Sequence, residues 1–334
     1  HIYTNIKNRL NAQVDFFRRV RTGLPAGRYD VLLPSELGFS LPKENLNSDV
    51  HIGYDAMVRW TDNINDFNYS VAGNVTYSRF YDWEQYDDRR SNSWDRYRNS
   101  IWHRVGYINW GHEVVGRFKD WEDIANYPID NDRKGNTTIV PGDFKYKDVN
   151  GDGVINGMDE RPIGYRSDST PNLNYGINVA ASWKGFDFAM DWTGSGLSSW
   201  AQRYETARPF QNDGNSPSEV FKDAWHLADI WDADSELIPG KYPLVRLGDN
   251  DSSYWTSDFW LHNVRYIKLR NLELGYTLPK VITTKAGISS MRVYLSGTNL
   301  LTFSNVPVDP EGIADNGLDY PTMRVINIGV NLKF

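Results

Sequence analysis

Apolar and polar residues alternate along the last stretch of the chain, residues 324–334. Ile326, Ile328, Val330 and Leu332 occupy every second position, and small or polar residues stand between them. This period of two predicts a β-strand with one apolar face and one wet face. A tilted strand of this length covers about 25 Å, which is the height of the apolar band of an outer-membrane barrel. An ordinary strand of a β-sandwich is the alternative interpretation of this stretch.

The same alternation recurs along the chain and predicts eight strands in total. They span residues 11–21, 51–61, 67–81, 174–183, 186–193, 265–278, 291–303 and 324–334. Within 265–278 the apolar phase switches, from Ile267 and Leu269 to Leu272 and Leu274. Because one extra residue moves side chains to the opposite face of a strand, this switch predicts a β-bulge.

The links between these strands alternate strictly between long and short. The short links, 62–66, 184–185 and 279–287, fit periplasmic turns, and the long ones fit extracellular loops, with the C-terminus in the periplasm. We therefore expect an all-β fold, a transmembrane antiparallel up-and-down β-barrel with long extracellular loops. The residues on the polar face of these strands are mostly small. Because a barrel of eight strands fills its interior with packed side chains, small residues indicate a wider lumen and more strands. The residues expected to face lipid are Tyr54, Val58, Val71, Tyr77, Tyr175, Val179, Phe188 and Val330.

Composition agrees with a barrel and excludes other classes. Aromatic residues make up 14%, as the aromatic girdles of a barrel require, and a mean hydropathy of −0.59 is compatible with strands of which only alternate residues face lipid. No apolar run is long enough for a membrane-spanning helix. The absence of cysteine excludes disulfides and thiolate metal sites. A net charge of −7 argues against nucleic acid as a partner.

One loop has the spacing of a calcium site. Oxygen ligands recur at alternate positions from residue 148, a glycine follows at the sixth position, and an aspartate ends the loop where glutamate is usual. This spacing predicts a structural site for Ca²⁺, with Mg²⁺ as the second candidate and a metal-free turn as the alternative. The candidate ligands are Asp148, Asn150, Asp152, Val154, Asn156 and Asp159.

Other candidate binding residues are tryptophans of the second long loop, and no motif indicates an enzyme. Their rings could stack on sugars, although packing within the loop is the favoured interpretation; they are Trp225, Trp231, Trp255 and Trp260. Arginines and aromatics interleave over residues 83–110, which we interpret as a strand rim with an aromatic girdle. No phosphate-binding loop, zinc-protease helix or serine nucleophile elbow occurs in the sequence.

Several segments together resemble the C-terminal part of SusC/RagA-like TonB-dependent outer-membrane transporters. The most specific match is residues 257–261 with 266–279, and residues 293–301 with 320–324 and Phe334 complete the resemblance. Residues 14–18, 41–46 and 142–153 add weaker matches, so the similarity extends over essentially the whole chain.

The resemblance implies uptake of oligosaccharides or peptides through a barrel of about 22 strands, together with a SusD-like lipoprotein. Residues 1–334 would be the C-terminal portion of that barrel, in contact with lipid and lipopolysaccharide. The earlier strands and the plug domain that TonB pulls would lie outside this sequence, so the chain should not close a barrel alone. A small stand-alone porin and a secreted carbohydrate-binding β-sandwich remain as alternatives.

Overall fold

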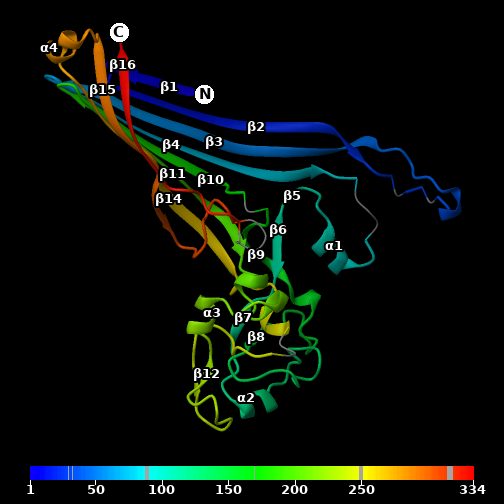
Figure 1. The fold of residues 1–334 in the computed structure, drawn as a ribbon. Helices are drawn as coiled ribbons and strands as arrows, with labels where there is room; N and C mark the ends of the chain where they lie inside the picture. Colours follow the sequence, from blue (N-terminus) through cyan, green and yellow to red (C-terminus); the bar gives the residue numbers. More distant parts are fainter. Residues whose placement is uncertain (29, 32, 87–89, 169, 248–250, 314–318) are drawn as a thin grey trace.

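The computed structural model is dominated by one large antiparallel sheet (Figure 1). It describes residues 1–334 except 29, 32, 87–89, 169, 248–250 and 314–318. Nine strands follow one another across the sheet, each hydrogen-bonded to the next. They are β1 (Ile2–Ile6), β2 (Leu10–Ala26), β3 (Glu44–Ile64), β4 (Phe67–Glu84), β10 (Leu173–Trp183), β11 (Phe186–Ala201), β14 (Leu261–Thr277), β15 (Ser290–Ser304) and β16 (Val325–Lys333).

All eight strands predicted from the alternation are confirmed, and β1 is an additional one. Several continue beyond the predicted bounds on the side of the long links. Residues 44–50 of β3 pair with β2 and β4, and residues 194–201 of β11 pair with β14. Hydrogen bonding therefore outlasts the apolar alternation at this end of the sheet.

The turns at the other end are tight. Strands β3 and β4 pair as far as Ile64 and Phe67, so the turn is only Asn65-Asp66, and β10 and β11 pair as far as Trp183 and Phe186 across Lys184-Gly185. Lys184 and Gly185 both have positive φ, at 46° and 90°, as a type I′ hairpin turn requires. The link between β14 and β15 instead holds two short helices, α4 (Lys280–Thr283) and η6 (Thr284–Ala286), which the sequence pattern did not predict.

The predicted bulge is confirmed within β14. Leu269 pairs with Trp192 and Asn271 with Asp191, so Arg270 is the extra residue between them. The extra residue restores the apolar face to Leu272 and Leu274 and turns the Arg270 side chain toward Asn299, whose Oδ1 accepts a bond of 2.8 Å from Nη1.

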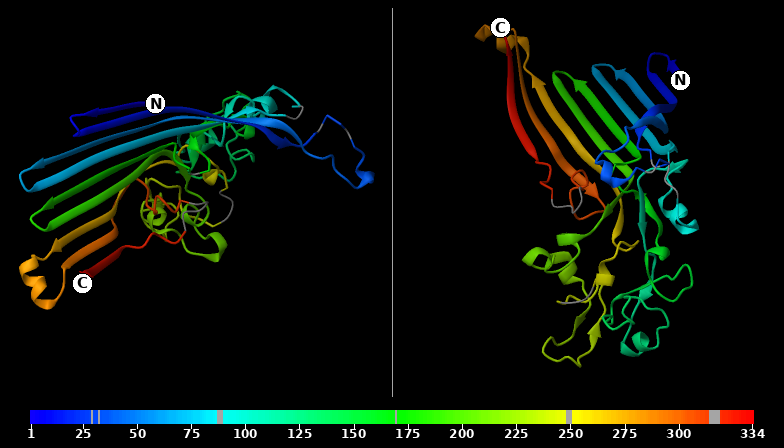
Figure 2. Two further views of the ribbon diagram at one scale, coloured as in Figure 1. Left: turned by 90° about the horizontal axis from the view of Figure 1, so that it is seen from above. Right: turned by 90° about the vertical axis from the view of Figure 1, so that its right-hand side faces the viewer.

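The sheet is open. Its strand order runs from β1 to β16, and among the described residues no pairing joins these two strands. Figure 2 shows the strands side by side along a curved surface, with the tight turns at one end.

Two of the long links, β4–β10 and β11–β14, build a compact lobe at the other end of the sheet (Figures 1 and 2). We use "the lobe" for the described residues of 106–166 and 202–260. Its strands are β6 (Ile108–Gly111), β7 (Val114–Arg117), β8 (Phe144–Tyr146), β9 (Arg161–Arg166), β12 (His226–Leu227) and β13 (Leu237–Ile238). Its helices are α2 (Trp121–Ala125), η2 (Gly157–Asp159), η3 (Tyr204–Thr206), η4 (Gln211–Asp213), α3 (Ser218–Lys222) and η5 (Asp251–Tyr254). One further 3-10 turn, η1 (Ser35–Leu37), lies in the β2–β3 link.

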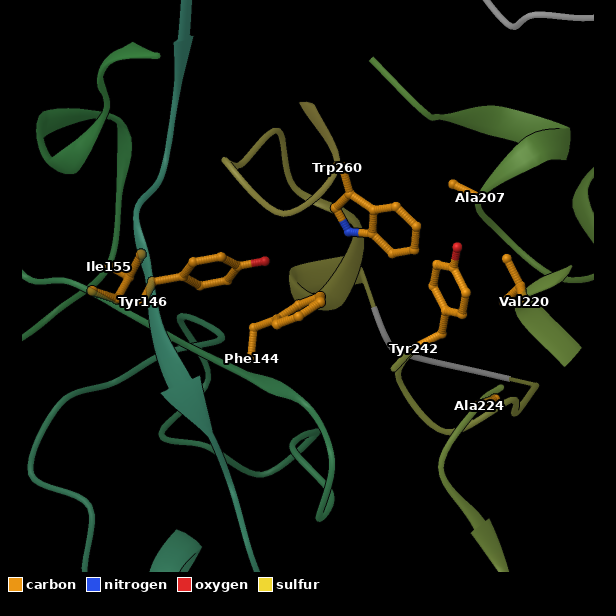
Figure 3. Packing of buried hydrophobic residues seen from close by; sticks show 8 residues of the cluster. All are labelled: Phe144, Tyr146, Ile155, Ala207, Val220, Ala224, Tyr242 and Trp260. Carbon is orange, nitrogen blue, oxygen red and sulfur yellow. The ribbon is translucent and has the colours of Figure 1, made fainter. Parts of the chain in front are cut away.

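The largest buried hydrophobic cluster belongs to the lobe and not to the sheet. Figure 3 shows Trp260 beside Tyr242, whose rings stack at 5.7 Å, and Phe144 on the other side. A second cluster, around Phe118, lies under α2, and a third, around Trp200, joins the sheet to the β15–β16 link. In the described part of the chain, no helix is long and apolar enough to cross a membrane.

The arginine-rich stretch 83–110 is not simply the rim of a strand, and our interpretation of it was incomplete. It contains the short helix α1 (Ser93–Asn99) and the two-residue strand β5 (Arg104–Val105), which pairs with β4. Arg98 and Arg104 lie over the ring of Trp110, at 4.4 and 5.7 Å from its centroid. These arginines pack on aromatic faces inside a folded segment.

Candidate functional site

The register of the sheet gathers apolar side chains on one face. Each member of one transverse row pairs with the next across eight strands: Leu10, Trp60, Val71, Val179, Met190, Leu272, Gly297 and Ile326. We call this side the apolar face. Many side chains on this face are exposed, including Val58 at 49% and Ile328 at 81%. A monomeric soluble protein rarely leaves so extended an apolar surface uncovered, so this face indicates contact with a membrane or a partner.

The opposite side, the polar face, has the complementary composition. The row one residue further along reads Thr61, Ser70, Ala180, Ala189, Glu273, Ser296 and Asn327. Charged groups of the sheet pair here: Arg292 bonds to Asp187 and Glu273, and Asn178 donates to Asp191 at 2.7 Å. Because ionised groups facing hydrocarbon are costly, this face must meet water or other protein.

A buried lysine fastens the β15–β16 link to the polar face. Lys268 is only 1% exposed, and its Nζ lies 3.3 Å from Asp309 and 2.8 Å from Glu311. Arg270, the bulged residue, pairs with the same Glu311. These ion pairs thus hold the β15–β16 link against β14. The signal for this cluster in the sequence is the pair Lys268 and Arg270, which flank the apolar Leu269 beside the phase switch.

We predict that acid releases this link. Burial alone would raise the pKa of Asp309, but hydrogen bonds from Thr322 and Glu311 and the charge of Lys268 outweigh it and lower the pKa to about 2. A lowered carboxyl pKa stabilises the folded link above the ordinary pKa near 4, and that stabilisation is lost as pH falls through the folded value. A pH-insensitive fluorophore on Tyr320→Cys should therefore gain mobility, by anisotropy, between about pH 4 and pH 2. A transition centred well above pH 4 would contradict this assignment.

The calcium-like loop folds around Asp152. Both Asn150 and Asn156 donate their side-chain N–H to Asp152 Oδ2, at 2.9 and 3.2 Å, and Asn156 also donates to the Val154 carbonyl at 3.1 Å. The carboxylate of Asp148 accepts hydrogen bonds from the backbone N–H groups of Gly151 and Gly153. Five of the six candidate ligands therefore surround one turn. Two of them are amides, whose oxygen and nitrogen exchange places by a simple rotation.

The sixth candidate, Asp159, has a different role. It is 1% exposed, and its two oxygens accept from the N–H groups of Val149 and Asn156, both at 2.8 Å. The described residues contain no group of three His, Cys, Asp or Glu side chains placed to hold a metal. Asp159, one of the predicted ligands, therefore does not converge with Asp148 and Asp152; it closes the loop by binding the loop's backbone.

The four candidate tryptophans separate into two groups. Trp260, 3% exposed, is buried in the main cluster of the lobe, and Trp225, 9% exposed, packs against Gly142, so their faces are not available to a sugar. Trp255 stacks on Tyr146 at 5.7 Å and carries Arg133 on its ring at 4.4 Å. Only Trp231, 90% exposed, presents an open ring. Packing within the loops therefore accounts for three of the four.

Comparison with known proteins agrees with the resemblance noted in the sequence. The chain is 29% identical over 240 residues to TonB-dependent receptor P3 of Formosa agariphila, covering 66% of this chain and 22% of the receptor. It is 26% identical over 243 residues to TonB-dependent receptor SusC of Bacteroides thetaiotaomicron, covering 70% of this chain and 20% of SusC. This chain thus spans about a fifth of the length of these relatives. No protein-family model matches it.

Solved structures support the fold. A chain of the RagAB peptide transporter superposes on 98% of this chain with a TM-score of 0.66, at 22% identity and over 34% of its own length. The similarity to SusC/RagA-like TonB-dependent receptors is confirmed, and the sheet has the fold of part of such a barrel.

Proposed function

We propose that this relative of the TonB-dependent receptors forms part of the wall and extracellular loops of an outer-membrane importer. The observation that carries the proposal is the division of the sheet into a continuous apolar face and a polar face that holds its ion pairs. Only such a two-faced wall satisfies lipid on one side and a water-filled lumen on the other.

The two sheet edges extend the proposal to further strands. Unpaired N–H and C=O groups along β1 and β16 cannot face hydrocarbon, because lipid offers them no hydrogen-bond partner. We infer that both edges pair with other strands of a larger barrel. A stand-alone porin would require β1 to meet β16, and the described residues show no such pairing. A sandwich would require a second sheet on the apolar face, whereas the two small sheets, β7–β8 and β12–β13, belong to the lobe.

The positions of turns and lobe suggest an orientation. In outer-membrane barrels the tight turns lie on the periplasmic side and the long loops on the extracellular side. The same arrangement here would place the C-terminus in the periplasm. A lobe outside the membrane offers a docking surface for a SusD-like lipoprotein, and TonB would act through a plug domain elsewhere in the assembly. The cargo we propose is an oligosaccharide or a peptide, taken up without chemical conversion.

Uptake in cells tests this function. Disruption of the gene that encodes this chain should abolish accumulation of the labelled cargo, and loss of TonB should do the same with the gene intact. Re-expression of the gene should restore accumulation only in cells that retain TonB. Uptake that persists when TonB is absent would contradict active import and favour a passive pore.

The loop around Asp152 is proposed as a structural Ca²⁺ site, with Mg²⁺ as the weaker candidate. The pKa of Asp152 is lowered, first by the Val154 N–H and then by the Asn150 side chain, so the carboxylate is charged at neutral pH. Rotation of the Asn150 and Asn156 amides would turn four side chains and one carbonyl toward a common cation. Asp159 would hold the loop closed without binding the ion.

We predict that Asp148→Ala with Asp152→Ala abolishes Ca²⁺ binding measured by calorimetry at millimolar concentration. Hydrogen exchange of residues 148–159 should increase by tenfold or more, while exchange in the sheet stays unchanged. Asp234→Ala, a change in an exposed aspartate of another link, is the matched control. Equal protection of the loop with and without Ca²⁺ would leave only the metal-free turn.

A further inference from the structure

A cavity of about 300 Å³ lies where the sheet meets the lobe. Strand β10 pairs with β4 only as far as Leu173 and Tyr77, and β5 resumes pairing with β4 at Tyr81. The interval between them, beside Arg79, is bordered by β6 and β9, the strands of the lobe that Figure 1 shows nearest the sheet. The cavity therefore lies where strand pairing along β4 is interrupted, and residues of the long β4–β10 link line it.

The lining of this cavity is basic. Arg79, Arg104 and Arg166 line it, and none of its described lining residues is acidic. Arg166 pairs with Asp168 at 2.8 Å, but no described carboxylate pairs with Arg79 or Arg104, which contact aromatic rings instead. Three arginines around one cavity are unexpected in a chain of net charge −7. Their arrangement favours an anionic ligand.

An unsatisfied acceptor lines the same cavity. The backbone of Asn172 bridges two strands, since its N–H donates to Leu197 and its carbonyl accepts from Ser78. Its side chain is 7% exposed, and Oδ1 is buried without a partner in the described structure. A buried acceptor of this kind requires a donor, such as a hydroxyl group of a ligand.

Aromatic rings complete the lining. Tyr165 is 38% exposed, which leaves its ring accessible for stacking, whereas Tyr107, 50% exposed, carries the Arg166 guanidinium over its ring at 4.8 Å. Tyr107 lies 5.4 Å from Phe80, which pairs with His51 on the polar face of the sheet. Gly164 holds β9 close at a φ of +61°, where a Cβ would come within 2.4 Å of Leu261. The cavity is thus held in shape. Phe80 contacts its lining from the polar face, whereas Tyr77 and Arg79 line it from the rows of Tyr54 and Ile52 on the apolar face.

We propose that this cavity binds one anionic sugar unit, a uronate or a sulfated hexose, of a cargo oligosaccharide. The acidic group would pair with Arg79 and Arg104, a ring hydroxyl would donate to Asn172 Oδ1, and the apolar sugar face would stack on tyrosine. A cavity of this volume has room for one or two rings. This inference rests on the proposed function only in taking cargo as the source of the sugar.

Calorimetry on the intact detergent-purified protein tests the site with two matched probes. Methyl β-D-glucuronide should bind at least tenfold more tightly than methyl β-D-glucoside, which lacks the charge. Arg79→Gln, a change in an exposed side chain, should weaken glucuronide binding about tenfold and leave glucoside binding within twofold. Asn172→Asp should also abolish the preference, and Arg96→Gln, in an exposed arginine of α1 outside the cavity, should preserve it.

Equal binding of the two probes, or unchanged glucuronide binding by Arg79→Gln, would overturn the proposal. A uronate oligosaccharide should displace the glucuronide, whereas displacement by lipopolysaccharide alone would refute the assignment to cargo. TonB-dependent uptake that continues without any glucuronide binding would refute this site and leave the proposed import intact.

Discussion

Val179→Arg is expected to lower the free energy of unfolding in lipid by about 2–4 kcal/mol, because it places a charge at mid-depth on the apolar face. Val179 lies near the centre of β10 and pairs with Val71 and Met190 on its two sides. An arginine there has no described carboxylate within its transverse row. Refolding into lipid vesicles, followed by a urea titration, measures the change.

Asn178→Arg is the matched control, one residue away on the polar face. Its side chain already bonds to Asp191, with which an arginine can pair, so we expect a change below about 1 kcal/mol. Equal destabilisation by the two variants would mean that β10 does not separate lipid from water.

Arg246→Met is expected to destabilise the lobe by about 3–5 kcal/mol, because it leaves a buried carboxylate without its cation. The Asp143 side chain is 0% exposed and accepts from Arg246 at 2.7 and 3.0 Å. Ser253 adds a bond of 2.8 Å. Urea unfolding followed by the fluorescence of the buried tryptophans Trp225 and Trp260 reports on this part of the chain.

The double variant Arg246→Met with Asp143→Asn separates charge burial from lost packing. With no charge left in the interior, it should be more stable than Arg246→Met alone. A loss below about 1 kcal/mol in the single variant would show that water reaches Asp143 and that the pair is not part of a dry core.

The sheet could be predicted from sequence because lipid and lumen impose a period of two on each spanning strand. That constraint ends where other protein segments cover a strand, as at Val50, Ser198 and Trp200, which are buried. Residues 44–50 and 194–201 therefore lack the alternation although their hydrogen bonding continues. The phase switch located the bulge at Arg270. Nothing local indicated its partner Glu311, which lies 41 residues further along the chain.

The lobe could not be predicted, because contacts distant in sequence organise it. Arg246 and Asp143 are separated by 103 residues, and the hydroxyl of Tyr146 donates to the carbonyl of Ser252 across 106 residues. Ligand spacing singled out the loop in which Asn150 and Asn156 gather around Asp152. It could not show that Asp159 is used by backbone N–H groups, since spacing alone does not distinguish a cation from an amide as the partner of a carboxylate.

Spin labels on the two faces of β10 test the central claim most directly, and the absence of cysteine from the chain makes single labels straightforward. Labels on Val179→Cys and Asn178→Cys would be compared in vesicles for collision with oxygen, which concentrates in lipid, and with a water-soluble nickel complex. We expect the Val179 label to meet oxygen and be shielded from nickel, and the Asn178 label to show the reverse. Equal nickel accessibility at both positions would contradict a wall between lipid and lumen.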